Sequence, residues 1–254
     1  MSSPELLTPD LVRRFTASHL AYWLFDWDGT LVDLAPRPDA IKVPPALLDH
    51  LRRLEKSHPG RVAVISGRSL DDLETWIPLP RLILVGNHGA EWRVEGQRRH
   101  APQDPGAAAA LDAVRTPLHD LARSLPGTAL EDKGWTFSFH VRGLGAEERE
   151  TCRTVIQAIV GPHPALCIRP ADGCWEIRPV LGPTKGDAVK RLLSNAPASA
   201  VPCVFGDDWT DEDAFEAVGT GLTVVVGNRR PTRARYHLPT PRHVRALLQN
   251  LTAY

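Results

Sequence analysis

The sequence has no excess of charge of either sign, because 30 lysines and arginines balance 30 aspartates and glutamates. It therefore has neither the basic footprint of a nucleic-acid-binding protein nor a membrane-surface patch. No stretch approaches the ~18 consecutive apolar residues of a membrane-spanning helix, and the polar segment 1–15 has no signal-peptide core. We expect a cytoplasmic protein with no nucleic-acid or membrane partner.

Cysteine is scarce, and its spacing excludes the usual metal and redox motifs. The four cysteines, at positions 152, 167, 174 and 203, have no C-x-x-C spacing and lie in apolar contexts. We expect reduced core thiols rather than ligands or disulfides. The P-loop motif G-x-x-x-x-G-K-[ST] is also absent.

The sequence does contain a pair of acids at the end of an apolar run. Asp26 and Asp28 follow Tyr22-Trp23-Leu24-Phe25 and precede Gly29. Two carboxylates at the end of a buried strand repel each other, and a divalent cation with oxygen ligands, Mg²⁺, relieves that cost. Gly29 permits a sharp turn. The alternative is a strand-end turn with solvated acids.

Further short apolar runs end in polar residues. Residues 61–65 lead into Ser66, 82–85 into Gly86-Asn87, 201–205 into Gly206-Asp207-Asp208, and 222–226 into Gly227-Asn228. Such runs, separated by helical stretches, predict buried parallel strands. In open α/β sheets, sites lie beyond the carboxyl ends of the strands. We therefore predict an α/β core with its site at this edge.

The middle of the chain has a different pattern. Helical spacing predicts one helix over about 107–125, which Pro117 would kink or break, and another over about 146–160. Alternation predicts a strand over 135–141, and Asp172-Gly173 predicts a hairpin. Turn-forming stretches at 101–106 and 179–184 bound this segment. We expect an α+β module inserted into the core, with domains over 1–102, 103–180 and 181–254, hinged at the two short crossings.

The polar strand ends resemble a known family. Asp26-Trp27-Asp28-Gly29-Thr30, Ser66, Lys185 and Gly206-Asp207-Asp208-Trp209-Thr210-Asp211 resemble the four motifs of haloacid dehalogenase (HAD) superfamily phosphatases. Five further stretches resemble the trehalose-6-phosphate phosphatases: Ile65-Ser66-Gly67-Arg68, Gly86-Asn87-His88-Gly89-Ala90-Glu91, Glu131-Asp132-Lys133-Gly134, Phe139-His140-Val141-Arg142 and Glu176-Ile177-Arg178-Pro179. The resemblance spans about residues 22–228, with Trp27 and Trp135 as small departures. It implies a Rossmann-like HAD core with an α+β cap of the C2B type.

The resemblance also implies roles for the core residues. Asp26 is expected to be the nucleophile, Asp28 the general acid and base, and Ser66 and Lys185 the phosphoryl-binding groups. Mg²⁺ is expected to bind the Asp26 carboxylate, the Asp28 carbonyl and Asp207. Asp208 and Asp211 stay open between contacts to the metal's surroundings and capping of the following helix.

Sugar recognition is expected mostly from the cap. The resemblance assigns Glu131, Lys133 and Glu176 to the disaccharide, with Arg68, Asn87 and Arg142 as further substrate contacts; the alternative is a solvated sheet face. Strict alternation, however, places Glu131 and Lys133 on the face of Trp135, Phe137 and Phe139, which should pack on helices. A register change near Gly134 would remove this conflict.

Together these features imply an enzyme that hydrolyses trehalose 6-phosphate to trehalose and phosphate, as a monomer with a small-molecule substrate. The alternatives are a phosphatase for another sugar phosphate, such as sucrose phosphate or a glycosyl-glycerate phosphate, a phosphomutase, and a non-catalytic regulator that binds sugar phosphate. The complete set of motif residues argues against an inactive protein.

Overall fold

A computed structural model describes residues 3–16, 20–35, 37–171, 173–228 and 231–252. The chain separates into two compact units, and each has its own sheet. The core unit comprises Met1–His100 and Pro183–Tyr254, and the inserted unit comprises Ala101–Gly182.

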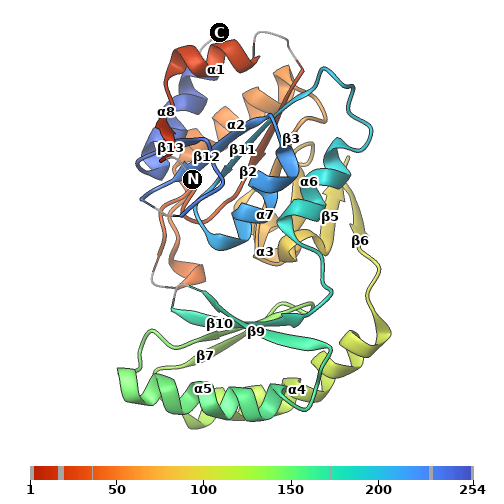
Figure 1. The fold of residues 1–254 in the computed structure, drawn as a ribbon, viewed down its shortest axis with the longest axis vertical. Helices are drawn as coiled ribbons and strands as arrows, with labels where there is room; N and C mark the ends of the chain where they lie inside the picture. The colour runs from red at the N-terminus through yellow and green to blue at the C-terminus, as the bar shows by residue number, and fades with distance from the viewer. Residues whose placement is uncertain (1–2, 17–19, 36, 172, 229–230, 253–254) are drawn as a thin grey trace. The chain divides into compact units, whose positions relative to one another are not determined.

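One mixed sheet, mostly parallel, forms the centre of the core unit (Figure 1). The described strands follow the order β1-β13-β12-β11-β2-β3-β4-β5-β6. All neighbouring pairs in this order are parallel as far as β4, whereas the pairs β4–β5 and β5–β6 at one edge are antiparallel. Their bounds are β1 Glu5–Leu6, β2 Ala21–Phe25, β3 Val62–Ile65, β4 Ile83–Gly86, β5 Glu91–Val94, β6 Gln97–His100, β11 Val201–Gly206, β12 Leu222–Val226 and β13 Tyr236–Leu238. The predicted parallel α/β core is confirmed.

Helices cover both faces of this sheet, because successive residues of each buried strand point to opposite faces. Trp23 and Phe25 of β2 pack with α2 and α8, whereas Leu24 packs with α6 and α7. The helices and short 3₁₀ turns of the core unit are α1 Pro9–Thr16, η1 Pro38–Ala40, α2 Pro45–Ser57, α3 Leu70–Trp76, η2 Asn87–Gly89, α6 Lys185–Leu193, α7 Trp209–Val218 and α8 Pro241–Leu251.

Local capping determines where the helices next to the strand ends begin. The Ser69 hydroxyl accepts a hydrogen bond from the Asp72 N–H at 3.2 Å and starts α3. Thr184 and Asp187 form a reciprocal capping box at the start of α6, so Lys185 is the first helical residue. These two caps position Lys185 and the loop from Ser66 to Ser69.

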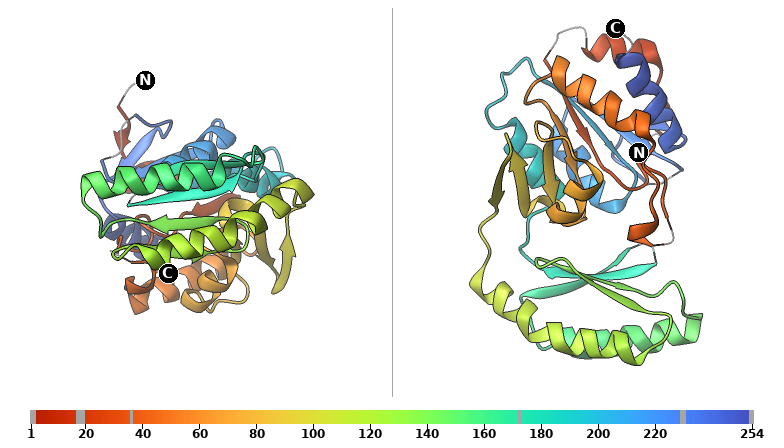
Figure 2. Two further views of the ribbon diagram at one scale, coloured as in Figure 1. Left: turned by 90° about the horizontal axis from the view of Figure 1, so that it is seen from below. Right: turned by 180° about the vertical axis from the view of Figure 1, so that it is seen from behind.

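The inserted unit is a four-stranded antiparallel sheet with two helices along one face (Figure 2). Its elements are α4 Pro105–Ser124, β7 Ala129–Asp132, β8 Phe137–His140, α5 Ala146–Val160, β9 Leu166–Ala171 and β10 Cys174–Pro179, with strand order β7-β8-β10-β9. Phe137, Phe139 and Ile177 are buried against α4 and α5. The predicted helix, strand, helix and hairpin are all present, and Pro117 does not divide α4.

Two features of the fold differ from the sequence-based expectations or were missing from them. The hairpin of β5 and β6 was not predicted, because its second strand, Gln97–His100, is exposed throughout and polar. The expectation of four core thiols holds fully for Cys152 and Cys203, which are buried, whereas Cys167 and Cys174 are partly exposed; all four are unpaired. Among the described residues, no helix combines the length and apolar character needed to cross a membrane.

Candidate active site

Three carboxylates gather at the carboxyl ends of two neighbouring strands. Asp26 follows β2 and Asp207 follows β11, and the two strands pair in parallel. Asp211, in the first turn of α7, brings a third carboxylate to the same place. One oxygen from each of the three lies within 4.8 Å of the others. We call Asp26, Asp207 and Asp211 the acidic cluster.

Lys185 is the cationic partner of the acidic cluster. Its Nζ donates to Asp26 Oδ1 at 2.6 Å and to Asp211 Oδ1 at 2.8 Å. The side chains of Lys185, Asp26 and Asp211 are no more than 6% exposed, so water screens these contacts little. The lysine thus fixes the carboxylate of Asp26 from one side.

Asp211 does more than cap α7. Its Oδ2 accepts hydrogen bonds from the backbone N–H groups of Asp207 at 3.1 Å and Asp208 at 3.0 Å, while its Oδ1 accepts from Lys185. One side chain therefore holds both the Asp207 loop and the lysine. Asp208 has a different role, because it is the N-cap residue of α7.

Two glycines make the close approach of these carboxylates possible. A Cβ on Gly29, whose φ is +76°, would lie 2.1 Å from Asp207 Oδ2. A Cβ on Gly206 would lie 2.2 Å from Asp211 Cγ. Any other residue at either position would displace a carboxylate of the acidic cluster.

Burial and neighbouring carboxylates raise the pKa of Asp26 and that of Asp207. Burial raises the pKa of Asp26 to about 7, with a further upward contribution from Asp211 and opposition from Lys185. Burial also raises the pKa of Asp207 well above its ordinary range, and the charges of Asp26 and Asp211 add to this. Burial alone would lower the pKa of Lys185, but Asp211 and Asp26 outweigh it and hold that pKa above its ordinary value.

These residues fit a divalent cation. Three carboxylates face one lysine, so the cluster has too little positive charge when all three are ionised. Burial is the main cause of the elevated pKa values of Asp26 and Asp207, and the charges of the neighbouring carboxylates add to it. Hard oxygen donors at this spacing are the ligand set that Mg²⁺ prefers.

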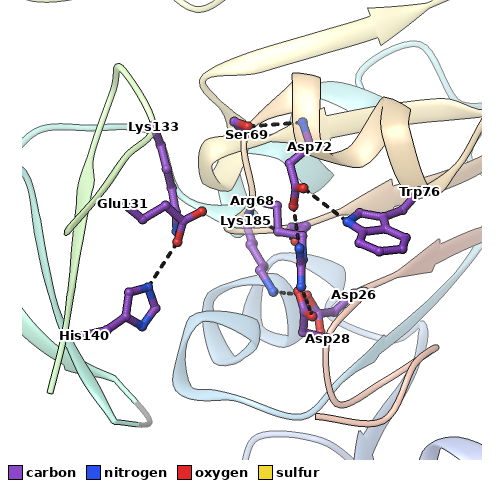
Figure 3. A network of polar contacts seen from close by, with 11 residues as sticks. Asp26, Asp28, Arg68, Ser69, Asp72, Trp76, Glu131, Lys133, His140 and Lys185 are labelled. Carbon is purple, nitrogen blue, oxygen red and sulfur yellow. Dashed lines mark hydrogen bonds and ion pairs between the residues drawn. The ribbon is translucent and has the colours of Figure 1, made fainter. Parts of the chain in front are cut away.

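The Asp28 carboxylate forms a separate ion pair with Arg68 (Figure 3). Arg68 Nε donates to Asp28 Oδ2 at 2.6 Å and Arg68 Nη2 donates to Asp28 Oδ1 at 2.7 Å, which is the bidentate geometry of a strong pair. Burial alone would lower the pKa of Arg68, but Asp28 and Asp72 hold it above its ordinary value. The structure thus directs Arg68, which we expected to contact substrate, to a carboxylate of the site.

Ser66 and Asn87 lie at the ends of β3 and β4. The buried Ser66 hydroxyl accepts from the Arg68 N–H at 3.2 Å. Asn87 is also buried and has a positive φ of 46°; its Nδ2 donates to Glu91 Oε2 at 2.7 Å. Glu91 accepts from the Leu70 N–H as well, at 2.9 Å. Glu91 therefore supports the strained corner at Asn87.

Two of the expected sugar-binding residues, Glu131 and Glu176, share one face of the inserted unit's sheet. Glu131 is opposite Ser138, Ser138 is opposite Glu176, and Glu176 is opposite Arg169. Directly opposite residues lie on the same face, and Asp132 and Phe137 pair on the other one. We call Glu131, Ser138, Glu176 and His140 the polar face.

The conflict raised by strict alternation does not occur, because β7 and β8 are separate strands. Gly134, with φ +76°, lies in the turn between them, and the Lys133 N–H donates to the Thr136 carbonyl at 3.0 Å. The strand expected over 135–141 begins at Phe137 instead. Glu131 is therefore on the face opposite Phe137.

Contacts on the polar face centre on Glu131 (Figure 3). His140 Nε2 lies 3.3 Å and Lys133 Nζ lies 3.8 Å from Glu131 Oε2. Arg142 lies over the β9–β10 turn, because a Cβ on Gly173 would be 2.3 Å from its Cγ. On this sheet face Glu131 and His140 are thus partly exposed, whereas Glu176 is buried.

Several residues of these networks were missed in the sequence. Asp72 and Trp76 have no motif, although Asp72 lies four residues after Arg68, a spacing that pairs opposite charges on a helix. The contact between His140 and Glu131 could not be found from spacing alone.

Comparisons with known proteins agree with this architecture. A model of the trehalose-phosphatase family matches residues 24–241. The trehalose-6-phosphate phosphatase of Escherichia coli is 33% identical over 255 residues, covering 99% of this chain and 92% of that protein. The trehalose-phosphate phosphatase of Mycobacterium bovis is 32% identical over 232 residues, covering 87% of this chain and 58% of that longer protein.

The fold match is equally extensive. The C-terminal domain of Candida albicans trehalose-6-phosphate phosphatase superposes with a TM-score of 0.84, covering 99% of both chains, at 23% identity. That similarity concerns the fold, which is the expected HAD architecture. With the family model and the bacterial relatives, it establishes that the chain belongs to the trehalose-phosphatase family.

Proposed function

We propose that this protein hydrolyses trehalose 6-phosphate to trehalose and phosphate through an aspartyl-phosphate, as a step of trehalose biosynthesis. The observation that carries the proposal is the buried carboxylate of Asp26, held by Lys185 beside Asp207 and Asp211. Its relatives' names supply the substrate.

In the first step, an Asp26 oxygen attacks phosphorus while the bond between phosphorus and the sugar oxygen breaks. Asp28 gives a proton to that oxygen, so trehalose leaves as an alcohol and Asp28 becomes a carboxylate. Lys185 and Ser66 stabilise the phosphoryl oxygens, because such transfers depend mainly on positioning and charge.

In the second step, Asp28 takes a proton from water, and the water oxygen bonds to phosphorus. The bond between Asp26 and phosphorus then breaks, which releases phosphate, restores the Asp26 carboxylate and leaves Asp28 protonated for the next cycle. One residue serves as acid and then as base because the second step reverses the proton transfer of the first.

Mg²⁺ would be held by the carboxylates of Asp26 and Asp207 and by the Asp28 carbonyl, and it supplies charge neutralisation for the phosphoryl group. Asp211 would act through Lys185 and the Asp207 loop. These residues fit this cation, because the crowded carboxylates require a second positive charge.

We assign the disaccharide to Glu131, Lys133, Glu176 and Arg142 of the inserted unit, which would act as the cap; Asn87 would support the substrate from the core. The expected cytoplasmic location and monomeric state remain predictions. Charge-assisted hydrogen bonds to hydroxyls suit a sugar that carries no charge of its own beyond the phosphate.

A phosphate-release panel over about twenty sugar phosphates tests the proposal. Trehalose 6-phosphate should have the highest kcat/KM. A preference for sucrose phosphate or a glycosyl-glycerate phosphate would change the substrate and keep the chemistry. Phosphate retained on an isomerised sugar would indicate a phosphomutase, and binding without release would indicate a regulator.

A further inference from the structure

Behind the Asp28–Arg68 pair lies a second carboxylate that no motif includes. Asp72, in the first turn of α3, accepts from Arg68 Nη1 through Oδ2. Its Oδ1 accepts from Trp76 Nε1 at 3.1 Å, and its backbone N–H donates to the Ser69 hydroxyl. Both carboxylate oxygens and the backbone of Asp72 are thus held by residues of α3 and of the loop that leads into it (Figure 3).

Arg68 joins this anchored acid to the proposed acid–base residue. The Arg68 side chain is 6% exposed, with its fork on Asp28 and its remaining terminal nitrogen on Asp72. A carboxylate has about four lone-pair sites, and the fork occupies two. The others stay available for the proton that Asp28 gives and takes.

We propose that Asp72 is a positioning residue for the hydrolysis: through Arg68 it fixes the orientation of the Asp28 carboxylate toward the oxygen of the leaving group. The inference rests on the proposed phosphatase chemistry and adds two residues, Asp72 and its donor Trp76, to it. Asp72 touches no reacting atom in this scheme.

The dependence of kcat/KM on the leaving group distinguishes a positioning role of Asp72 from a purely structural one. An alkyl phosphate needs the proton from Asp28 as its oxygen departs, whereas p-nitrophenolate is stable without it. The comparison uses kcat/KM, which covers the steps through formation of the aspartyl-phosphate. A misplaced Asp28 should therefore reduce hydrolysis of alkyl phosphates selectively.

The experiment compares Asp72→Asn with Asp71→Asn on three substrates: trehalose 6-phosphate, glycerol 2-phosphate and p-nitrophenyl phosphate. Asp71 is a matched control, because it is the neighbouring acid in the same helical turn, is largely exposed and pairs instead with Arg98 at 2.7 Å. Both changes remove one negative charge near the start of α3. Glycerol 2-phosphate offers an alkyl leaving group without a disaccharide.

For Asp72→Asn we expect a loss of about 10-fold or more in kcat/KM on both alkyl phosphates, and less than about twofold on p-nitrophenyl phosphate, as for loss of an outer partner of a catalytic group. Asp71→Asn should leave all three unchanged. Equal losses on all three substrates, or no loss on any, would overturn the inference. Wild-type protein that hydrolyses none of them would instead overturn the proposed phosphatase function.

Trp76→Phe provides a second arm if Asp72→Asn does not fold. It removes the Nε1–H donor and keeps an aromatic ring at the partly buried position. The same split between alkyl and aryl phosphates, about two- to fivefold, supports the anchor. A uniform effect, or none, contradicts it.

Discussion

The acidic cluster of the core unit and the polar face of the inserted unit handle charge in opposite ways. In the acidic cluster, Lys185 and Asp26 are almost fully buried and are joined at 2.6 Å. On the polar face, Glu131 is 28% exposed and its partners lie 3.3 Å and 3.8 Å away. Buried charges must be matched inside the protein, whereas partly exposed ones can exchange water for a ligand.

This difference separates chemistry from recognition. Groups that stabilise a developing charge are most effective when they are preorganised and dry, as Lys185 is. Groups that recognise hydroxyls must lose water and gain a ligand, which suits the looser contacts of Glu131. Changes in the acidic cluster should therefore affect every phosphate ester, and changes on the polar face only the sugar substrate.

The largest effect should come from Asp26→Asn, which we expect to reduce turnover of all phosphate esters by at least about 10³-fold because an amide forms no acyl-phosphate. Folding should survive, because the size is conserved and Lys185 keeps its contact with Asp211. Phosphate release and a thermal melt check both points. Wild-type activity in this variant would rule out the covalent route.

Removal of divalent metal comes next. Activity should fall by more than about 10²-fold in EDTA and return with Mg²⁺, since the crowded carboxylates need a cation. Both trehalose 6-phosphate and p-nitrophenyl phosphate should respond equally, as the acidic cluster serves both. Full activity after exhaustive chelation, with metal content checked by elemental analysis, would contradict this.

On the polar face, Glu131→Ala or Glu176→Ala should reduce kcat/KM for trehalose 6-phosphate by on the order of 10², as for loss of charge-assisted hydrogen bonds. Glycerol 2-phosphate and p-nitrophenyl phosphate should be nearly unaffected, because neither carries the disaccharide hydroxyls that these glutamates would bind. If all substrates fall together, these glutamates act on structure or chemistry. If none falls, the polar face is only a solvated surface.

The apparent Mg²⁺ affinity should depend on pH through the acidic cluster. The pKa of Asp26 is about 7 in the folded protein, and protons compete with the metal, so affinity should weaken as pH falls through about 7 by up to about 10-fold per unit. Calorimetric titration with Mg²⁺ at pH 6, 7 and 8 measures this. An affinity independent of pH would place Asp26 outside the ligand set.

The fold could be predicted where short, continuous apolar runs end in turn-forming residues. Runs such as 62–65 and 222–226 predict buried strands of a covered sheet, and the structure has them as β3 and β12. The exposed edge strand β6 could not be predicted in this way, since its residues Gln97–His100 have no apolar face.

The site was predicted from the resemblance to motifs more than from local physics. Lys185 is 159 residues from Asp26, and Asp26 and Asp207 follow separate strands; only their motifs connected them. Asp72 could not be predicted as a site residue, because its role depends on the direction of the Arg68 guanidinium, which no spacing rule predicts.

The smallest expected effect on activity comes from replacing one glycine in each unit, which allows a direct comparison of the two units. Gly134, between β7 and β8, and Gly96, between β5 and β6, both have φ +76°, and a Cβ on either would meet nothing within 4 Å. Replacement by alanine therefore costs only backbone strain, about 1–2 kcal/mol at each site. The two changes are matched in conformation and differ in which unit they perturb.

Gly134→Ala should reduce kcat/KM for trehalose 6-phosphate by about two- to fivefold, because the turn sets the register that places Glu131 on the polar face. Hydrolysis of p-nitrophenyl phosphate should not change. Gly96→Ala should lower thermal stability by a similar amount and leave both activities intact. If the two variants have the same activity profile, the turn at Gly134 has no part in recognition and Glu131 is positioned by the strands alone.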